Sequence, residues 1–212
     1  MKNLNKFILI LFLFLLLIIL SAYSYSNAVY SDISNNVFRL HVIANSDSTA
    51  DQELKLIVRD SILEYVSNIS NSTSNKNELI ELLNQNKLEI QTIAEDIIKE
   101  HGFDYSVNVS IGNFEFPIKS YGDISLPTGY YDALKLEIGN AKGKNWWCVM
   151  FPPLCFVDVS SGIMPEESKN ILEENLLAEE YNLISSSSSD DVKIKFKIVE
   201  LFQNVKMSTA KK

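Results

Sequence analysis

An unbroken run of apolar side chains at residues 7–20 limits what the start of the chain can become. It follows two lysines, Lys2 and Lys6, and precedes a stretch of mostly small residues at 21–28. A positive start, a short apolar run and small residues are typical of a secretion signal. As a helix the run would measure about 21 Å, against about 30 Å for the hydrocarbon core of a membrane. We therefore interpret residues 1–28 as a signal peptide and residues 29–212 as a single domain outside the cytoplasm.

The same segment has a second interpretation, as an uncleaved signal anchor. Cleavage could follow Ser24, Ser26 or Ala28, because each has a small residue two positions before it. An anchor would instead require residues 21–28 to continue the apolar helix. Contact with a membrane is expected only through this segment, and only if it is retained.

The rest of the chain is acidic. The whole chain has 27 acidic and 19 basic side chains and a net charge of −8, and removing the two lysines of residues 1–28 brings this to −10. Binding to nucleic acid requires basic side chains that neutralise phosphates. The charge therefore excludes nucleic acid as a general partner.

The first half of the domain has one short strand followed by helices. Residues 38–43 predict a buried strand, and the turn-forming residues 45–48 follow it. Asp47 or Ser48 can cap a helix that has apolar residues on one face up to Val66. A loop is expected at 67–77, and then a helical region at 78–101 that divides near 84–86.

The second half changes to the alternation of strands. Side chains alternate around 105–111 and 134–138, and a turn at 140–145 predicts a hairpin with a strand at 146–151. A helix is expected at 165–181, a serine-rich linker loop at 184–191, and a last strand at 192–198 whose lysines suit an exposed sheet edge. These elements predict a two-layer α+β domain with helices packed on a mostly antiparallel sheet.

Few residues are available for catalysis or metal binding. The two histidines, His41 and His101, have no metal-ligand spacing to each other, so no metal site and no cofactor are expected. Ser46 with His41 and a nearby acid could form a hydrolase site, but cap and turn chemistry already explains the serine. We keep an extracytoplasmic hydrolase that uses Ser46 and His41 as an alternative.

The two cysteines, Cys148 and Cys155, lie seven positions apart across a Pro-Pro pair. A disulfide between them would contribute about 2.5 kcal/mol in the chain-entropy model. Two buried free thiols explain the same positions equally well, and the sequence leaves both open.

The adjacent tryptophans, Trp146 and Trp147, must point to opposite faces if they lie on a strand. One of them then lies on the outer face, under the last strand or at a partner surface. A sheet covered on both sides is the alternative that needs no partner.

Several segments together carry a specific resemblance. They are the segment LHVIANSDS at 40–48 with residues 51–52, 54–55 and 58–60, then residues 116–117, 119 and 121–122, then the segment NWWCVMFPPLCFVD at 145–158, with a looser match at 195–200. In this order they resemble the stage II sporulation protein R family. The resemblance implies a secreted signalling protein of endospore formation, which is exported from the forespore into the space between the two membranes. There it would activate the membrane-embedded aspartic protease of the mother cell, the stage II sporulation protease GA, which processes the precursor of sigma factor E.

The first hypothesis is therefore a protein ligand without catalytic residues or a small-molecule substrate, which binds the external face of a membrane protease. The partner-binding residues that we infer are Arg39, His41, Asn45, Asp47, and Trp146 or Trp147, whichever is exposed. Besides the hydrolase, a membrane-anchored envelope protein is the second alternative.

Overall fold

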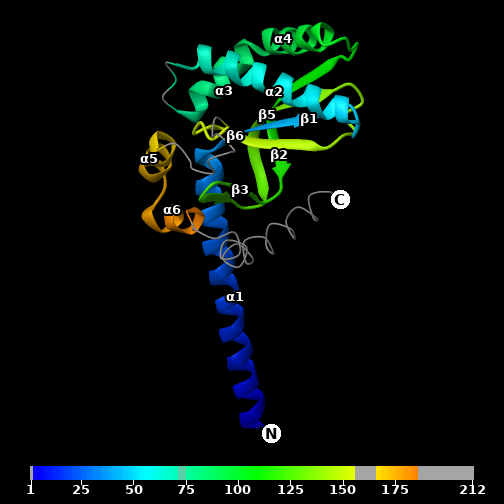
Figure 1. Cartoon of the computed structure of the whole chain (residues 1–212). Helices are drawn as coiled ribbons and strands as arrows, with labels where there is room; N and C mark the ends of the chain where they lie inside the picture. Colours follow the sequence, from blue (N-terminus) through cyan, green and yellow to red (C-terminus); the bar gives the residue numbers. More distant parts are fainter. Residues whose placement is uncertain (1, 72, 74, 156–165, 186–212) are drawn as a thin grey trace.

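The computed structural model describes residues 2–71, 73, 75–155 and 166–185 (Figure 1). The elements in chain order are α1 (Lys2–Asn36), β1 (Phe38–Ile43), α2 (Thr49–Ile69), α3 (Lys76–Gln85), α4 (Lys87–Glu100), β2 (Val107–Phe116), β3 (Lys119–Tyr121), β4 (Ile124–Leu126), β5 (Gly129–Ile138), β6 (Asn145–Phe151), α5 (Glu166–Asn175) and α6 (Ala178–Ile184). Most of the predicted serine-rich linker and all of the predicted strand at 192–198 lie outside the described residues.

The main sheet has four strands in the order β2-β5-β1-β6. The β2–β5 and β1–β6 pairs are antiparallel, and β1 runs parallel to β5. With helices packed on this sheet, the predicted α+β class is confirmed. The predicted hairpin is wrong, however, because β1 lies between β5 and β6 and pairs with both. Residues 140–145 therefore connect two strands that are not neighbours.

The helices α2, α3 and α4 cover one face of the sheet (Figure 1). Ser48 is the N-cap of α2, and its hydroxyl accepts a hydrogen bond from the backbone N–H of Asp51. The apolar face of α2 packs on Leu40 and Val42 of β1, which are fully buried. The division of the second helical region near 84–86 is confirmed, since α3 ends at Gln85 and α4 begins at Lys87. The predicted loop at 67–77 is shorter, because α2 continues to Ile69.

A second, smaller cluster covers the opposite face. Its apolar side chains come from the end of α1, from the β3–β4 hairpin and from the helices α5 and α6. Tyr30 and Ile33 of α1 are buried there, and the ring of Tyr30 occupies the space where Gly129 would otherwise carry a Cβ. The helix predicted at 165–181 is divided, because α5 ends at Asn175 and α6 begins at Ala178.

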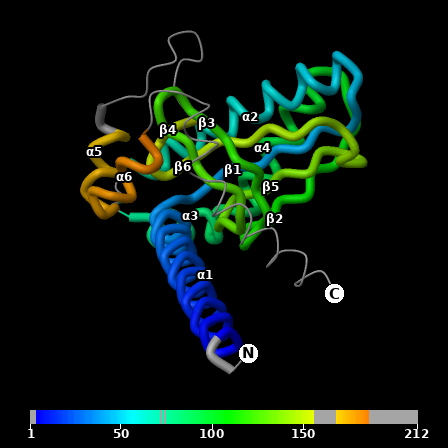
Figure 2. The backbone as a smooth tube through the Cα atoms, turned by 90° about the horizontal axis from the view of Figure 1, so that it is seen from below, coloured from blue at the N-terminus to red at the C-terminus, as the bar shows by residue number. Residues whose placement is uncertain are grey.

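The long helix α1 joins this cluster to the apolar start of the chain. It extends away from the domain in both views (Figures 1 and 2). Its stretch Leu4–Asn36 is long and apolar enough to cross a membrane, and the most apolar part of it is unburied. Residues 21–28 are helical, which is the condition that a signal anchor requires. The helix is compatible with a signal peptide and with an anchor.

Candidate functional site

Arg39 lies at the centre of the face opposite α2–α4, and its side chain is completely buried. Its guanidinium carbon lies 4.1 Å from the ring centre of Phe116 and 4.7 Å from that of Tyr131. Its Nη2 donates a hydrogen bond of 2.7 Å to Oη of Tyr121. Among the described residues, Nε and Nη1 of Arg39 have no hydrogen-bond partner. The site therefore contains a buried cation that aromatic rings stabilise and that no described carboxylate neutralises.

His41 follows on the same face of β1 and is nearly as buried as Arg39. Its ring stacks on Trp147 with 3.7 Å between ring centres. Its Nε2 lies 2.7 Å from Oδ1 of Asn145, to which it can donate in the neutral state. Burial lowers the pKa of His41 from 6.5 to about 4, although the bond to Asn145 acts in the opposite direction. The imidazole is therefore neutral near pH 7 and connects β1 to β6.

The burial of Arg39 and His41 agrees with the prediction that residues 38–43 form a buried strand. Both are covered because β1 is an inner strand and the second cluster covers this face. A partner would not contact Arg39 directly in this conformation. Whether either residue contributes to binding stays a prediction.

Asn45 and Asp47 connect the turn after β1 to the segment between β5 and β6. Oδ1 of Asn45 accepts a bond of 2.9 Å from the backbone N–H of Asn140. Oδ1 of Asp47 accepts one of 2.7 Å from the backbone N–H of Lys144. These bonds, with two between backbone groups of the same segments, hold the two turns together. The contacts of both side chains are explained by the fold, and partner binding by them stays a prediction.

The two side chains of the hydrolase alternative point to different partners. The hydroxyl of Ser46 donates to the carboxylate of Asp51, whereas His41 is bonded to Asn145. Burial alone would raise the pKa of Asp51, but hydrogen bonds from Ser46 and Asn45 outweigh it and lower the pKa. The geometric condition for this alternative, a hydrogen bond between Ser46 and His41, is therefore not met.

The adjacent tryptophans point to opposite faces of β6, as predicted from strand geometry. Trp146 lies on the helix side, where the guanidinium carbon of Arg59 is 4.1 Å from its ring centre. Trp147 lies on the other side, between His41 and Phe116. Both tryptophans are half-buried. The sheet is covered on both faces, yet each tryptophan keeps some exposed surface.

Cys148 and Cys155 are joined in a disulfide, with 5.4 Å between their Cα atoms. The bond closes the turn that follows β6. In this turn the backbone N–H groups of Leu154 and Cys155 both donate to the carbonyl of Val149. The disulfide therefore holds the turn against the end of β6.

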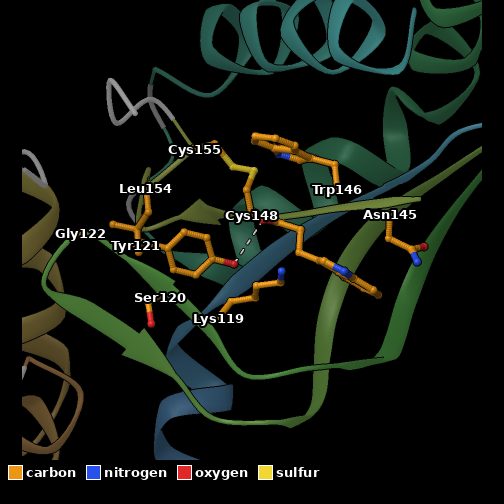
Figure 3. Close-up of a pocket in the computed structure, with 10 residues that line it drawn as sticks. Lys119, Ser120, Tyr121, Gly122, Asn145, Trp146, Cys148, Leu154 and Cys155 are labelled. Carbon is orange, nitrogen blue, oxygen red and sulfur yellow. Dashed lines mark hydrogen bonds between the residues drawn. A yellow bond between two sulfur atoms is a disulfide. The ribbon is translucent and has the colours of Figure 1, made fainter. Parts of the chain in front are cut away.

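A groove of about 430 Å³ lies beside β6, and we call it the β6-edge groove. Residues 119–122 of β3 and the following turn form one wall, and residues 145–148 of β6 form the other (Figure 3). Leu154 and Cys155 close it at the disulfide end. Of the lining residues in the described part of the chain, Lys119 alone is charged.

Part of this site was not predicted from the sequence. Lys119 and Tyr121 belong to the segments that carried the family resemblance, but nothing local to them indicated a site. Phe116, in the same segments, contributes the ring under Arg39. The family resemblance grouped these residues with the tryptophan segment at 145–158. Their spacing along the chain gave no indication that they lie together. Within the described part of the chain, no group of three His, Cys, Asp or Glu residues could hold a metal ion.

Comparison with known protein families shows to which family the chain belongs. The family model described as Stage II sporulation protein R matches residues 34–161, which is more than half of the chain. The chain belongs to the stage II sporulation protein R family. The matched range begins in the last turn of α1 and includes every residue that lines the β6-edge groove. The family is named for sporulation and is not an enzyme family by name.

A curated relative supports this membership. The Stage II sporulation protein R of Bacillus subtilis (strain 168) is 36% identical over 138 residues, which cover 65% of this chain and 62% of the relative. The chain thus spans about three fifths of the length of that relative. No solved structure matches the chain.

Proposed function

We propose that the chain is a secreted signalling protein of endospore formation, made in the forespore and exported into the space between the two membranes. It acts there as a protein ligand that activates the membrane-embedded aspartic protease of the mother cell, the stage II sporulation protease GA. That protease processes the precursor of the mother-cell sigma factor E. Membership of the stage II sporulation protein R family carries this proposal.

Two features of the structure agree with the role of a secreted protein ligand. The apolar part of α1 is separate from the folded domain, as an export segment would be. The domain also has a half-buried aromatic surface at the sheet edge, where Trp146 and Trp147 lie beside the exposed Asn145. Tryptophan is frequent among the residues that dominate binding energy at protein interfaces.

Activation would follow from binding. A ligand shifts a protease between two states only by binding one state more tightly than the other. To change an equilibrium from about 1:99 to about 99:1, the preference must be about 10⁴-fold. A preference for the dimeric form of the protease would be one way to reach this ratio.

Reconstitution tests the proposal. The protease and the sigma-factor precursor are placed in lipid vesicles, and the purified full-length chain is added on the external side. We expect precursor cleavage only when the chain is present, and none when a catalytic aspartate of the protease is replaced by asparagine. Cleavage at the same rate without the chain would refute the activating role.

A membrane-anchored envelope protein remains the second candidate, because residues 21–28 continue α1 as an anchor requires. The two candidates differ in whether the apolar N-terminal segment is removed from the exported chain. An N-terminal sequence that begins at Tyr25, Asn27 or Val29 would exclude the anchored form.

A further inference from the structure

The outer edge of β6 presents backbone groups to the β6-edge groove. The strand order places β6 at the edge of the main sheet, and within the described residues only β1 pairs with it. Two bonds show which carbonyls point outward. The carbonyl of Trp147 accepts from Oη of Tyr121 at 3.4 Å (dashed in Figure 3), and that of Val149 accepts from the turn after β6. Because outward and inward groups alternate along an antiparallel strand, the N–H and C=O of Asn145 also point outward.

The walls of the groove favour an extended chain. At the far end, Leu154 and the disulfide-bonded Cys155 stop it, and at the near end Asn145 is exposed. The ring of Tyr121 lies along the wall that β3 forms (Figure 3). A strand added along β6 could therefore use backbone hydrogen bonds beside Asn145 and Trp147 and place alternate side chains against the aromatic rings.

The charge of the groove is opposite to that of the chain. Among the described residues, Lys119 is the only charged side chain that lines it, and none of the lining side chains is acidic. Behind Tyr121 lies the guanidinium of Arg39, which is fully buried and lacks partners at Nε and Nη1 among the described residues. The whole chain has a net charge of −8. Neither cation forms an ion pair with a carboxylate of the described residues, and together they make the groove a positive spot on an acidic protein.

We propose that the β6-edge groove binds an extended, acidic segment of a protein partner as an additional strand on β6. The backbone of the segment pairs with β6 from Asn145 to Trp147, and one of its carboxylates lies near Lys119. Arg39 strengthens this preference for a carboxylate from behind Tyr121. The proposal deepens the proposed function, because it states the kind of segment that the partner would present.

The two tryptophans of the chain provide the readout, since both line the groove. Their fluorescence is followed in the full-length chain while a synthetic pentapeptide TVEVT with blocked ends is added. Two peptides serve as matched controls: TVKVT, and TVEVT methylated on alternate backbone nitrogens. We expect saturable binding of TVEVT and at least tenfold weaker binding of either control, because one lacks the carboxylate and the other cannot pair as a strand.

Two charge reversals locate the contact on the protein. We expect Lys119→Glu to reverse the preference, so that TVKVT binds more tightly than TVEVT. Lys99→Glu, at an exposed position of α4, should keep the wild-type preference. Folding of both variants is checked by circular dichroism.

Three results would overturn the proposal: no binding of TVEVT, equal binding of TVEVT and TVKVT, or undiminished binding of the methylated peptide. Absence of binding is also the expected result if residues 192–198 or a second copy of the chain cover the edge of β6. No protease is present in these experiments. Their failure would therefore leave the proposed activation of the protease untouched.

Discussion

The guanidinium of Arg39 and the hydroxyl of Tyr121 form a hydrogen bond of 2.7 Å between Nη2 and Oη, although 82 residues separate them along the chain. The bond joins β1 of the main sheet to β3 of the small hairpin that covers it. Tyr121 is the only hydrogen-bond partner of the Arg39 side chain among the described residues. Burial raises the pKa of Tyr121, so its hydroxyl stays protonated and can donate in turn to the carbonyl of Trp147.

Replacement of Tyr121 should therefore destabilise the domain. We expect Tyr121→Phe to lower the free energy of unfolding by about 1.5–3 kcal/mol, because a buried charged group loses its hydrogen bond. Urea denaturation measures the change. The matched control is Tyr130→Phe. This position is half-buried, its side chain forms no hydrogen bond with another described residue, and the change should alter stability by less than about 0.5 kcal/mol. Equal effects of the two variants would contradict the prediction.

His41 should make stability depend on pH. Burial lowers its pKa from 6.5 to about 4, so between these values the unfolded chain binds a proton that the folded chain does not. The stabilisation is fully present above about pH 6.5 and is lost as the pH falls toward 4. Between pH 7 and 5 we expect a loss of about 1–2 kcal/mol, after allowance for partial contact with solvent.

The measurement for His41 is urea denaturation at the two pH values. His41→Gln serves as the reference, because it removes the titrating group while the carboxylates still titrate. The wild-type chain should lose more stability than the variant on acidification. If both lose the same amount, His41 is not the source of the pH dependence.

Gly143 lies in the segment between β5 and β6, where this segment packs against the turn that follows β1. A Cβ at this position would overlap the backbone carbonyl of Ser46. We expect Gly143→Ala to destabilise the domain by about 2 kcal/mol, because backbone atoms must move to make room. Gly112→Ala is the control, since its Cβ would meet the ring of Phe114 at 3.6 Å, an ordinary contact distance. Thermal unfolding compares the two variants, and a more harmful Gly112→Ala would speak against the packing argument.

The end of α1 should be indispensable for folding. Tyr30 and Ile33 are buried, and loss of each large side chain from the core costs about 2–3 kcal/mol, a large share of ordinary domain stability. We expect a chain of residues 25–212 to fold and one of residues 37–212 to remain unfolded by circular dichroism. A folded 37–212 fragment would show that this packing is dispensable.

The burial of the end of α1 also indicates which signal-peptide cleavage positions are compatible with the fold. Val29 is 3% exposed, so cleavage after Ala28 would create a charged amino group in a buried position. Tyr25 is 58% exposed. Asn27 is half-buried. If the chain is processed, N-terminal sequencing should therefore give Tyr25 or Asn27, and a sequence beginning at Val29 would count against this packing.

Reduction of the disulfide should lower stability. The bond joins Cys148 to Cys155 in a loop whose ends are seven positions apart, for which the chain-entropy model gives about 2.5 kcal/mol. We expect the chain to unfold at lower urea concentration after reduction, and the double variant Cys148→Ala with Cys155→Ser to be insensitive to the reductant. Modification of both thiols in the unreduced chain would show that the bond does not form.

Local patterns were sufficient for several elements. The strand at 38–43 and the division between α3 and α4 follow from short-range periodicity and from turn residues, which act within a few positions. Adjacent side chains of a strand must diverge, so the opposite directions of Trp146 and Trp147 also followed from the sequence. Membership of the family followed from the segments at 40–60 and 145–158 as well.

The position of β1 in the sheet was decided only by the tertiary structure. An alternating pattern shows which residues share a face, but not which strands lie on either side or what covers that face. The insertion of β1 between β5 and β6 turned an expected hairpin into separate strands and made β1 an inner strand. The β3–β4 hairpin and the end of α1 then covered its second face. Together they placed Arg39 in the core, although arginine as a residue type had suggested an interface anchor.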